Sequence, residues 1–336
     1  MTQLQRICVA LVASAPAALA SDLNLSVESG ASNTISVSPC STVNYAVVGE
    51  LSDALNEGLA SYRFNLSFDG GDLAQADAPG SAPMDHFKAP KGLNNPDGFG
   101  GTLSGGDLIQ VGGAQNTINS QFTGLLSTPV LTGTVVTGIA QPGSEATLVT
   151  GSLTAPTQPG TYTLSITEIG ANVIRQGEVG PPTDPFWAVD AAPTGTVTNL
   201  TINVVGLSAA PASLSVSGGG VQTLSLDAGV CNAGGTYFLL GSVSGTTPGL
   251  PLTGGLNLPL NIGPYFNLTL SSPNTAPLGN SLNVLNGSGQ GTATFTLPAG
   301  AFPTLVGVTA NHAFLVLNGV PAVSFTSEAA PLTFGL

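Results

Sequence analysis

Few side chains in this sequence are suited to acid, base or nucleophilic chemistry. Its 336 residues include two histidines, His86 and His312, and only 7% of the residues are charged. Ordinary globular domains contain roughly 25% charged residues, and most enzyme mechanisms require a poised acid, base or nucleophile. We therefore expect a protein that is not an enzyme and has no catalytic residues.

The two histidines give little support to a hydrolase. His312 lies where a strand is expected to begin, and His86 lies in an expected loop. No G-x-S-x-G motif is present, although the run 241–245 is superficially similar. We expect His312 to be an edge or core histidine bonded to the backbone, and His86 to be a surface residue. A hydrolase with an unrecognised site remains the third alternative for the function.

The best aromatic patch of the sequence is Phe186-Trp187, which Asp184 and Asp190 flank. An aromatic pair beside carboxylates could stack on a sugar ring. The alternative is a plug that closes one end of a β-sandwich. We favour the plug, because tryptophan is highly buried on average.

A second candidate contact region is the Gly- and Asn-rich stretch 92–119. Its candidate ligand-binding residues are Phe99, Gln110, Gln115 and Asn116. Side-chain amides with few charges nearby suit hydrogen bonds to sugar hydroxyls or to the backbone edge of a protein partner. An ordered but inert surface loop is an equal alternative.

Three aspartates in turns are the candidate metal ligands. Asp69 and Asp72 lie three residues apart around Gly70-Gly71, and Asp97 lies in a further turn. Calcium binds several oxygen ligands on flexible turns, but this spacing does not match an EF-hand loop. We expect plain turns and no cofactor, with Ca²⁺ at these residues as the alternative.

The first 20 residues have the order of a secretory signal peptide. Arg6 precedes the apolar run 7–20, and Ala18-Leu19-Ala20 forms a small-x-small cleavage site. This run is shorter than the about 20 residues of a membrane-spanning helix. No later segment reaches 18 uninterrupted apolar residues. We therefore expect export and no membrane span.

The mature chain is strongly acidic. Loss of Arg6 with the signal peptide changes the net charge from −13 to −14. Such a chain repels phosphate backbones and anionic lipids, so we expect neither nucleic acid nor a membrane surface as a partner.

Two cysteines remain after the signal peptide, Cys40 and Cys231. An even number permits a disulfide in an exported protein, and this one would clamp two domains together. Free cysteines also behave as small hydrophobic residues. Both alternatives stay open, and we favour two separate buried thiols.

Alternation of apolar and polar residues with a period of two predicts β-strands along the chain. Helices are disfavoured by 45 Gly and 25 Pro, and only Ser52 to Ala60 is expected to be helical. Many short strands separated by Gly and Pro turns predict an all-β chain with two β-sandwich domains of jelly-roll or immunoglobulin-like type in tandem. The alternation is clearest at 62–68, 162–166, 200–204, 214–216, 224–226 and 266–270.

The mature length exceeds what one sandwich usually holds. A strand closes the first unit at Val205, and a new alternating strand follows after Pro211. We therefore predict a first sandwich at 21–205, a linker at 206–210 and a second, smaller sandwich at 211–336.

Four segments of the first domain, 43–47, 64–69, 160–164 and 199–202, resemble the cohesin-like sandwiches of secreted bacterial proteins in strand order and turn placement. The resemblance implies a nine-stranded jelly roll that binds a dockerin partner and has no catalytic activity. The insertion around 75–120 departs from the cohesin pattern, and the sequence has no dockerin-like calcium repeats.

The second domain resembles a C-terminal module of secreted bacterial proteins for which no activity is known. The segments that carry this resemblance are 237–242, 256–260 and 305–314.

We expect a secreted or cell-surface binding or scaffold protein that contacts an extracellular protein or polysaccharide through loops of the first sandwich. The main alternative is a self-assembling surface-layer or fibre subunit, because low charge and exposed strand edges allow close packing of copies.

Overall fold

The computed structural model describes residues 21–77, 87–88, 101–115, 130–132, 136–177, 186–300, 303–317 and 322–336. The expected signal peptide, residues 1–20, lies outside the described residues, so export remains a prediction. Among the described residues, no helix combines the length and the apolar character that a membrane crossing requires.

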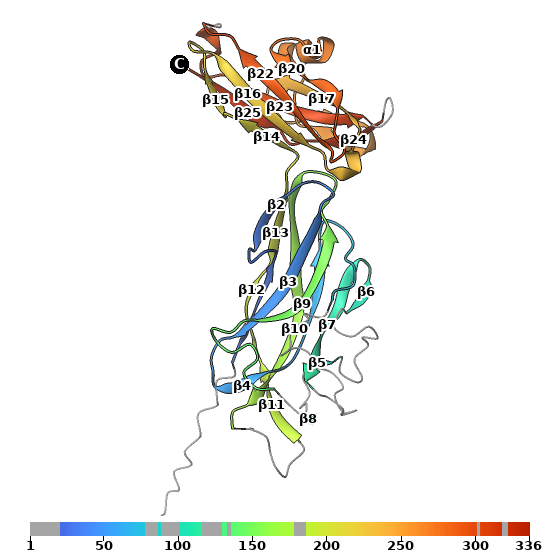
Figure 1. Cartoon of the computed structure of the whole chain (residues 1–336), viewed down its shortest axis with the longest axis vertical. Helices are drawn as coiled ribbons and strands as arrows, with labels where there is room; N and C mark the ends of the chain where they lie inside the picture. The colour runs from blue at the N-terminus through green and yellow to red at the C-terminus, as the bar shows by residue number, and fades with distance from the viewer. Residues whose placement is uncertain are drawn as a thin grey trace, which may run out of the picture.

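The chain folds into two β-sandwiches that meet end to end (Figure 1). Strands β1 to β13 build the first sandwich, and β14 to β25 build the second. No sheet in the described part of the chain combines strands from both. The predicted all-β fold class is therefore confirmed.

The first sandwich packs a sheet of order β12-β1-β3-β9 against a larger sheet of order β2-β13-β10-β4-β7-β5, to which β6, β8 and β11 are added. Its core is made by the alternate side chains of the long strands, such as Tyr62, Phe64 and Leu66 of β4, which are fully buried. The alternation in 62–68 thus has the burial that the sequence predicts. The bounds are β1 (Leu23–Glu28), β2 (Thr34–Val37), β3 (Thr42–Leu51), β4 (Asn56–Phe68), β5 (Phe87–Lys88), β6 (Thr102–Ser104), β7 (Asp107–Gln115), β8 (Val130–Thr132), β9 (Ala146–Thr154), β10 (Gly160–Arg175), β11 (Phe186–Ala192), β12 (Thr194–Thr198) and β13 (Leu200–Val204).

The second sandwich packs a sheet of order β14-β16-β22-β20 against one of order β15-β25-β23-β17-β21, with β24 paired to β23 and a small β18-β19 pair beside them. Its core contains Leu224, Tyr237, Phe314 and Leu332, and is separate from the first core. The bounds are β14 (Leu207–Ala210), β15 (Ser213–Ser215), β16 (Gly220–Asp227), β17 (Thr236–Ser242), β18 (Leu250–Pro251), β19 (Asn257–Leu258), α1 (Pro264–Ser271), β20 (Leu278–Gly279), β21 (Leu282–Val284), β22 (Gln290–Leu297), β23 (Thr309–Leu317), β24 (Val323–Thr326) and β25 (Ala330–Gly335), with 3₁₀ turns at Val230–Asn232, Thr253–Gly255 and Pro303–Leu305.

The expected helix at Ser52 to Ala60 is wrong. Strand β4 begins at Asn56 and pairs with β10, and Leu59 and Ala60 are fully buried in the core between the sheets. Gly58 has φ of +109°, a conformation that a helix excludes. Burial in the sheet overrides the local helix propensity of this short segment.

The expected strand at 266–270 is also wrong, because this segment is α1. Pro264 at the first helical position presets the helical φ. The buried side chains Phe266 and Thr269 are three residues apart, as on one face of a helix, whereas Leu268 and Leu270 are each 47% exposed. Five alternating residues do not distinguish a strand from a single-sided helix turn.

The linker is shorter than the expected 206–210. Residues Leu207–Ala210 form β14, which pairs with β16 from Leu207–Leu226 to Ala210–Thr223. Only Val205 and Gly206 separate β13 from β14. The connection between the two sandwiches therefore consists of only these two residues.

Candidate functional site

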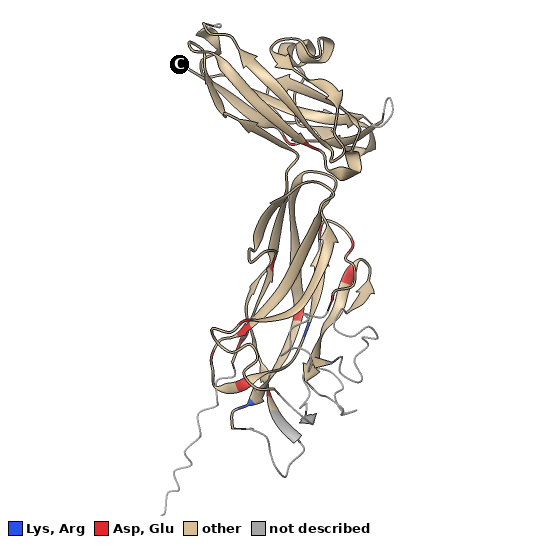
Figure 2. Ribbon diagram, in the orientation of Figure 1, with Lys and Arg blue, Asp and Glu red and all other residues tan. Residues whose placement is uncertain are grey.

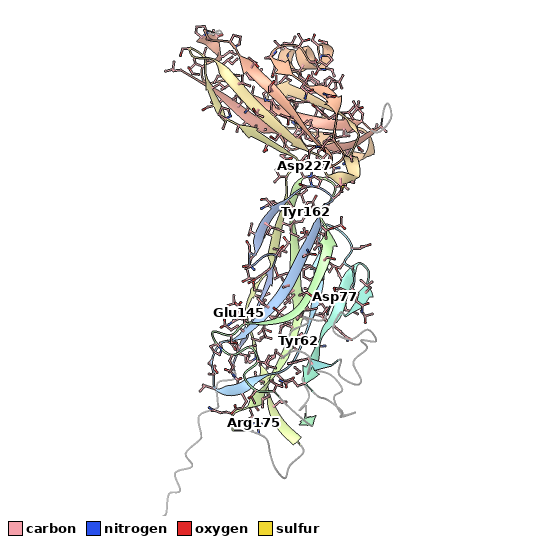
Figure 3. The ribbon with its side chains drawn as sticks, viewed as in Figure 1. Tyr62, Asp77, Glu145, Tyr162, Arg175 and Asp227 are labelled. Atoms are coloured by element: carbon pink, nitrogen blue, oxygen red, sulfur yellow. A yellow bond between two sulfur atoms is a disulfide. The ribbon has the colours of Figure 1, made fainter. Side chains whose placement is uncertain are left out.

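The last 126 residues, 211–336, contain only two charged side chains, Asp227 and Glu328. Both lie at the end of the second sandwich that meets the first (Figures 2 and 3). The Glu328 carboxylate accepts hydrogen bonds from the backbone N–H groups of Gly206, at 3.0 and 3.1 Å, and of Leu207, at 3.1 Å. A half-buried charge is stable only with such partners. Glu328 therefore fixes the short connector against the second sandwich.

A disulfide bonds Cys40, three residues after the end of β2, to Cys231 in the 3₁₀ turn Val230–Asn232, with 6.1 Å between the two Cα atoms. The expectation of two separate thiols is thus wrong. The two cysteines are separated by 191 residues, so the sequence alone does not indicate that they lie close together. The bridge joins a loop of the first sandwich to a loop of the second.

The backbones on either side of this disulfide are in close contact. Gly229 has φ of +76°, and a Cβ atom at this position would collide with the carbonyl of Pro39. Only glycine allows this approach without displacing one loop from the other.

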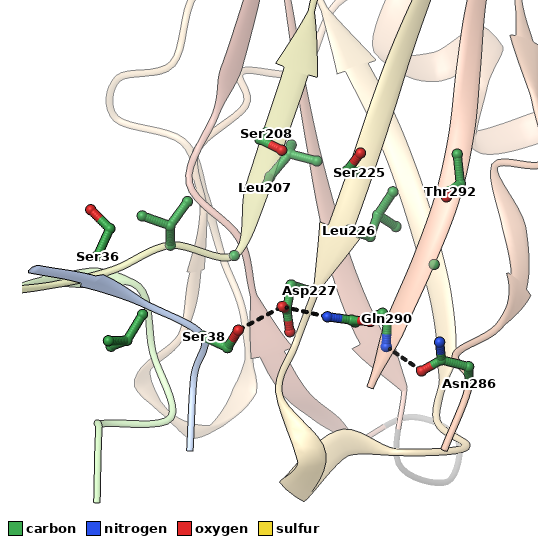
Figure 4. A pocket seen from close by; sticks show the side chains of 14 residues that line it. Ser36, Ser38, Leu207, Ser208, Ser225, Leu226, Asp227, Asn286, Gln290 and Thr292 are labelled. Carbon is green, nitrogen blue, oxygen red and sulfur yellow. Dashed lines mark hydrogen bonds between the residues drawn. The ribbon is translucent and has the colours of Figure 1, made fainter. Parts of the chain in front are cut away.

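Asp227 connects the two sandwiches through its carboxylate (Figure 4). Its Oδ2 atom accepts hydrogen bonds from the Ser38 hydroxyl at 2.7 Å and from the Gln290 side-chain amide at 3.1 Å. Its Oδ1 atom accepts the backbone N–H of Gly229 at 3.0 Å. One carboxylate therefore holds β16, β22 and the loop after β2 together.

Gln158 makes a further connection between the sandwiches. Its side-chain amide donates to the carbonyl of Ser324 at 3.4 Å, and its Oε1 atom accepts the backbone N–H of Thr326 at 3.4 Å. These are long hydrogen bonds. They support the disulfide and the carboxylates without replacing them.

An open polar cleft of about 590 Å³ lies between the sandwiches, and Ser38, Asp227 and Gln290 are among the residues that line it. Its floor is the outer face of the sheet β14-β16-β22, where Ser208, Ser225 and Thr292 lie side by side in register (Figure 4). Within the described part of the chain, no hydrogen-bond partner is found for these three hydroxyls. They are available to a molecule in the cleft.

The wall of the cleft comes from the first sandwich and the connector. Ser36 and Val37 of β2 contribute to it, as do Val205 and Gly206. Both β2 and β14 are the terminal strands of their sheets, each paired on one side only among the described strands. Terminal strands are where a further strand can be added.

The side chains of four of the six ligand-binding residues expected from the sequence are not among those described. Phe99 and Asn116 lie outside the described residues, and so does His86. Phe186 and Trp187 lie in β11, but their side chains are not among those described. Their roles remain predictions.

Gln110 and Gln115 both lie in β7 but in different environments. Gln115 is fully buried; its side-chain amide donates to the carbonyls of Leu59 and Val136, and its Oε1 atom accepts the Val136 N–H. It has no surface left for a ligand and instead supports the sandwich. Gln110 has φ of +57°, and its backbone N–H donates to the Asn65 side chain. The structure does not bring these two amides together.

The candidate calcium ligands do not form a cluster in the described residues. The Asp69 carboxylate accepts the backbone N–H of Thr163 in β10 at 2.7 Å. Asp72 is also described, and Asp97 lies outside the described residues. No group of three or more His, Cys, Asp or Glu side chains comes together among the residues that the structure describes.

His312 is fully buried in the second sandwich, as the sequence predicts, but its partner differs from the expected backbone group. Its Nε2 atom lies 2.9 Å from the hydroxyl of Tyr265.

Sequence reasoning missed the residues that build the cleft. The available signal was the confinement of charge in the second half of the chain to Asp227 and Glu328. Charged side chains are rarely buried without a partner, and partners of these two lie at the junction.

Comparisons with known proteins do not assign a family. No family model matches the sequence, and no curated protein matches it. Similar solved structures include the seventh ScaB type I cohesin of Pseudobacteroides cellulosolvens, at 12% identity and a TM-score of 0.32, covering 55% of this chain and 92% of the cohesin.

Two further similar structures extend over most of the chain. The type II cohesin dyad from the adaptor ScaA scaffoldin of Acetivibrio cellulolyticus has 10% identity and a TM-score of 0.28, covering 94% of this chain and 98% of the dyad. The major pilin subunit BcpA of Bacillus cereus has 7% identity and a TM-score of 0.27, covering 93% of this chain and 66% of the pilin. Similarity at this level identifies no partner for this chain.

Proposed function

We propose that this chain is an exported, non-enzymatic binding protein that holds an extended segment of an extracellular protein in the cleft between its sandwiches. The observation that carries the proposal is the preformed cleft, which a disulfide and two hydrogen-bonded carboxylates hold open. A site that is rigid before binding loses less entropy when its partner arrives.

The chemistry of the cleft favours a peptide over a sugar or an apolar small molecule. Pockets for small ligands are lined mainly by apolar and aromatic side chains, whereas the described lining of this cleft contains no aromatic ring. Hydroxyls such as those of Ser208, Ser225 and Thr292 can pair with the N–H and C=O groups of an extended backbone. An extended peptide can also pair its backbone with an exposed terminal strand of a sheet.

The loops of the first sandwich were the contact region expected from the sequence. The stretch 92–119 is described only in part, at 101–115. Contact through these loops, with a protein or a polysaccharide, remains a prediction, and the cleft is the better supported region.

Photo-crosslinking from a single position tests the proposal. Benzoylphenylalanine is placed at Ser225 on the floor of the cleft and, as a matched control, at Val221. Both side chains are exposed on β16 and face the same side of its sheet, but Val221 lies outside the cleft. Each protein is irradiated with the extracellular proteins of the producing cells.

The proposal predicts a discrete crosslinked protein with the probe at Ser225 and none with the probe at Val221. An excess of unlabelled wild-type chain should compete with this product, and an excess of the Ser225→Trp variant should not. Identical products from both positions, or none from either, would contradict the proposal. A product that periodate degrades would indicate a glycan instead of a protein.

Self-assembly is the second candidate, favoured by the outer face of the sheet β14-β16-β22, on which Asp227 is the one charged side chain among the described residues, and by its terminal strand β14. Flat uncharged faces and free edges permit copies to pack. A sedimentation coefficient of the mature protein that rises with concentration, and a crosslinked product containing two copies of this chain, would support this candidate.

A further inference from the structure

The second sandwich contains an apolar pocket that is separate from the junction cleft. It has a volume of about 660 Å³ and lies between α1, the end of β22 and β25. Pockets of roughly 300–1,000 Å³ that are mostly apolar and contain a few polar groups are typical small-molecule sites. The lining includes the rings of Tyr265, Phe295 and Phe334, with Leu297, Leu305 and Ala310.

The aromatic side chains of the pocket form a connected group. The Phe295 ring lies 5.8 Å from that of Phe334 and 5.3 Å from the imidazole of His312, between ring centroids. The Tyr265 ring meets the same imidazole edge-on, at 82°. The second sandwich therefore places one buried polar pair, Tyr265 and His312, at the boundary of an apolar space.

The position of Tyr265 depends on a glycine in the strand beneath it. A Cβ atom at Gly241 of β17 would collide with the Tyr265 ring. His312 lies opposite Gly241 on the neighbouring strand β23. The missing side chain at 241 thus makes room for the tyrosine beside the histidine.

The Tyr265–His312 pair has one polar hydrogen more than the hydrogen bond between the two side chains requires. Burial lowers the pKa of His312 to about 4, so at neutral pH the ring carries a single N–H. The contact of 2.9 Å between Nε2 and the Tyr265 hydroxyl uses one hydrogen. The pair holds two, the ring N–H and the phenol O–H.

The location of the second hydrogen follows from the burial of the pair. If Tyr265 donates to Nε2, the proton sits on Nδ1, which is buried with no hydrogen-bond partner among the described residues. If Nε2–H donates to Tyr265, Nδ1 is only an unused acceptor and the phenol O–H is free. The first arrangement leaves a ring N–H unpaired at a buried atom, whereas the second leaves the phenol O–H on a side chain that lines the pocket. A buried donor without a partner is costly, which favours the second arrangement. Tyr265 lines the pocket, and in this arrangement the hydrogen of its hydroxyl has no partner among the described residues.

We propose that this pocket binds a small, uncharged, apolar molecule whose hydrogen-bond acceptor, such as a carbonyl oxygen, takes the hydrogen of the Tyr265 hydroxyl. The rings of Phe295 and Phe334 pack against its apolar body. This binding site is separate from the junction cleft and does not depend on the function proposed for it.

A matched pair of probes tests the inference. The ketone 2-acetonaphthone and the hydrocarbon 2-ethylnaphthalene have nearly the same shape, but only the ketone has an acceptor oxygen. Binding is measured by fluorescence titration of the full mature chain. We expect the wild-type protein to prefer the ketone by roughly tenfold, the effect of one buried hydrogen bond.

Two tyrosine variants test whether the preference for the ketone comes from the Tyr265 hydroxyl. Tyr265→Phe keeps the ring but removes the proposed donor together with the contact to His312, so the preference should fall to about onefold while hydrocarbon affinity stays the same. Tyr237→Phe is the control, because Tyr237 is buried in the same sandwich but donates to the Asn280 carbonyl and does not line the pocket. This variant should keep the full preference.

Methyl NMR of the wild-type protein locates the probes independently of any variant. Leu297, Leu305 and Ala310 should shift on titration, whereas Leu224 and Leu226, in the same sandwich but outside the pocket lining, should not. No saturable binding, shifts elsewhere, equal affinity for ketone and hydrocarbon, or a preference that persists in Tyr265→Phe would each overturn the proposal.

Discussion

The two sandwiches use charge in different ways. All five basic and sixteen of the 18 acidic side chains of the sequence precede residue 211, whereas the second sandwich has only Asp227 and Glu328. In the first sandwich, charges such as the Arg175–Asp190 pair lie on the surface, where ion pairs add little stability. In the second, both carboxylates bind groups at the junction. Charge in the second sandwich therefore has a structural role at the position where the two sandwiches meet.

The junction cleft and the pocket beside α1 differ in the same sense. The junction cleft is polar and exists only because residues from both sandwiches are held together. The pocket beside α1 is apolar and is built by the second sandwich alone. Changes at the junction should thus affect the cleft and leave the pocket intact.

The largest effect is expected from loss of the disulfide. In the Cys40→Ser, Cys231→Ser double variant, closing a loop of 191 residues no longer restricts the unfolded chain, a loss of up to about 5 kcal/mol on the loop-entropy account. The sandwiches should then unfold in two calorimetric transitions that are further apart than in the oxidised protein. Superimposable traces for the two proteins would show that the disulfide does not couple the sandwiches.

A pH effect confined to the second sandwich is expected to be next in size. Burial lowers the pKa of His312 from 6.5 to about 4, so between these values the unfolded chain binds a proton that the folded chain does not. Stability from this group is complete above pH 6.5 and decreases as the pH falls to 4, by about 3 kcal/mol.

Chemical denaturation at several pH values measures this slope in the wild-type protein, in His312→Gln and in His86→Gln. The slope between pH 6.5 and 4 should become smaller in His312→Gln and stay unchanged in His86→Gln. Equal slopes in all three proteins would mean that His312 is not the group responsible.

A smaller effect is expected for Glu328→Gln. The variant keeps the shape of the side chain but removes the charge that strengthens its bonds to the Gly206 and Leu207 N–H groups, which should cost about 1–2 kcal/mol. Glu145→Gln is the control, because no hydrogen bond or ion pair of the Glu145 side chain is found within the described residues. If both substitutions have the same effect on the free energy of unfolding, the role assigned to Glu328 is wrong.

The smallest effect is expected for Ser38→Ala. It removes one hydrogen bond to the Asp227 carboxylate, worth about 1 kcal/mol at this partly exposed site. The nearby Ser36→Ala removes a hydroxyl for which no partner is found among the described residues, and should leave the free energy of unfolding unchanged. Denaturation curves that shift equally for both variants would contradict the difference between these serines.

The sequence predicts the architecture well where one strand buries one face. In 62–68 the alternate residues Tyr62, Phe64 and Leu66 are all fully buried. The same rule fails at 266–270, where the segment is short and Pro264 begins a helix. The alternation rule also misses the first part of strand β4, around Leu59, because burial between the sheets overrides the local helix propensity there.

The candidate site could not be predicted from local patterns. Ser38 and Asp227 are separated by 189 residues, and a single sequence gives no information about which distant residues meet. The disulfide has the same difficulty, since spacing alone does not decide whether Cys40 and Cys231 pair. The apolar pocket is hidden for a further reason: the space for Tyr265 comes from the absence of a side chain at Gly241.

The most direct test of the account is hydrogen exchange of the Gly206 and Leu207 amides, which donate to Glu328 at the junction. In the oxidised protein these amides should exchange at least about tenfold more slowly than in the Cys40→Ser, Cys231→Ser variant. The Leu239 amide, bonded to Ser281 inside the second sandwich, should exchange at the same rate in both. Equal exchange of Gly206 and Leu207 in the two proteins, at the rate of an unprotected amide, would show that the junction is not held and that no preformed cleft exists.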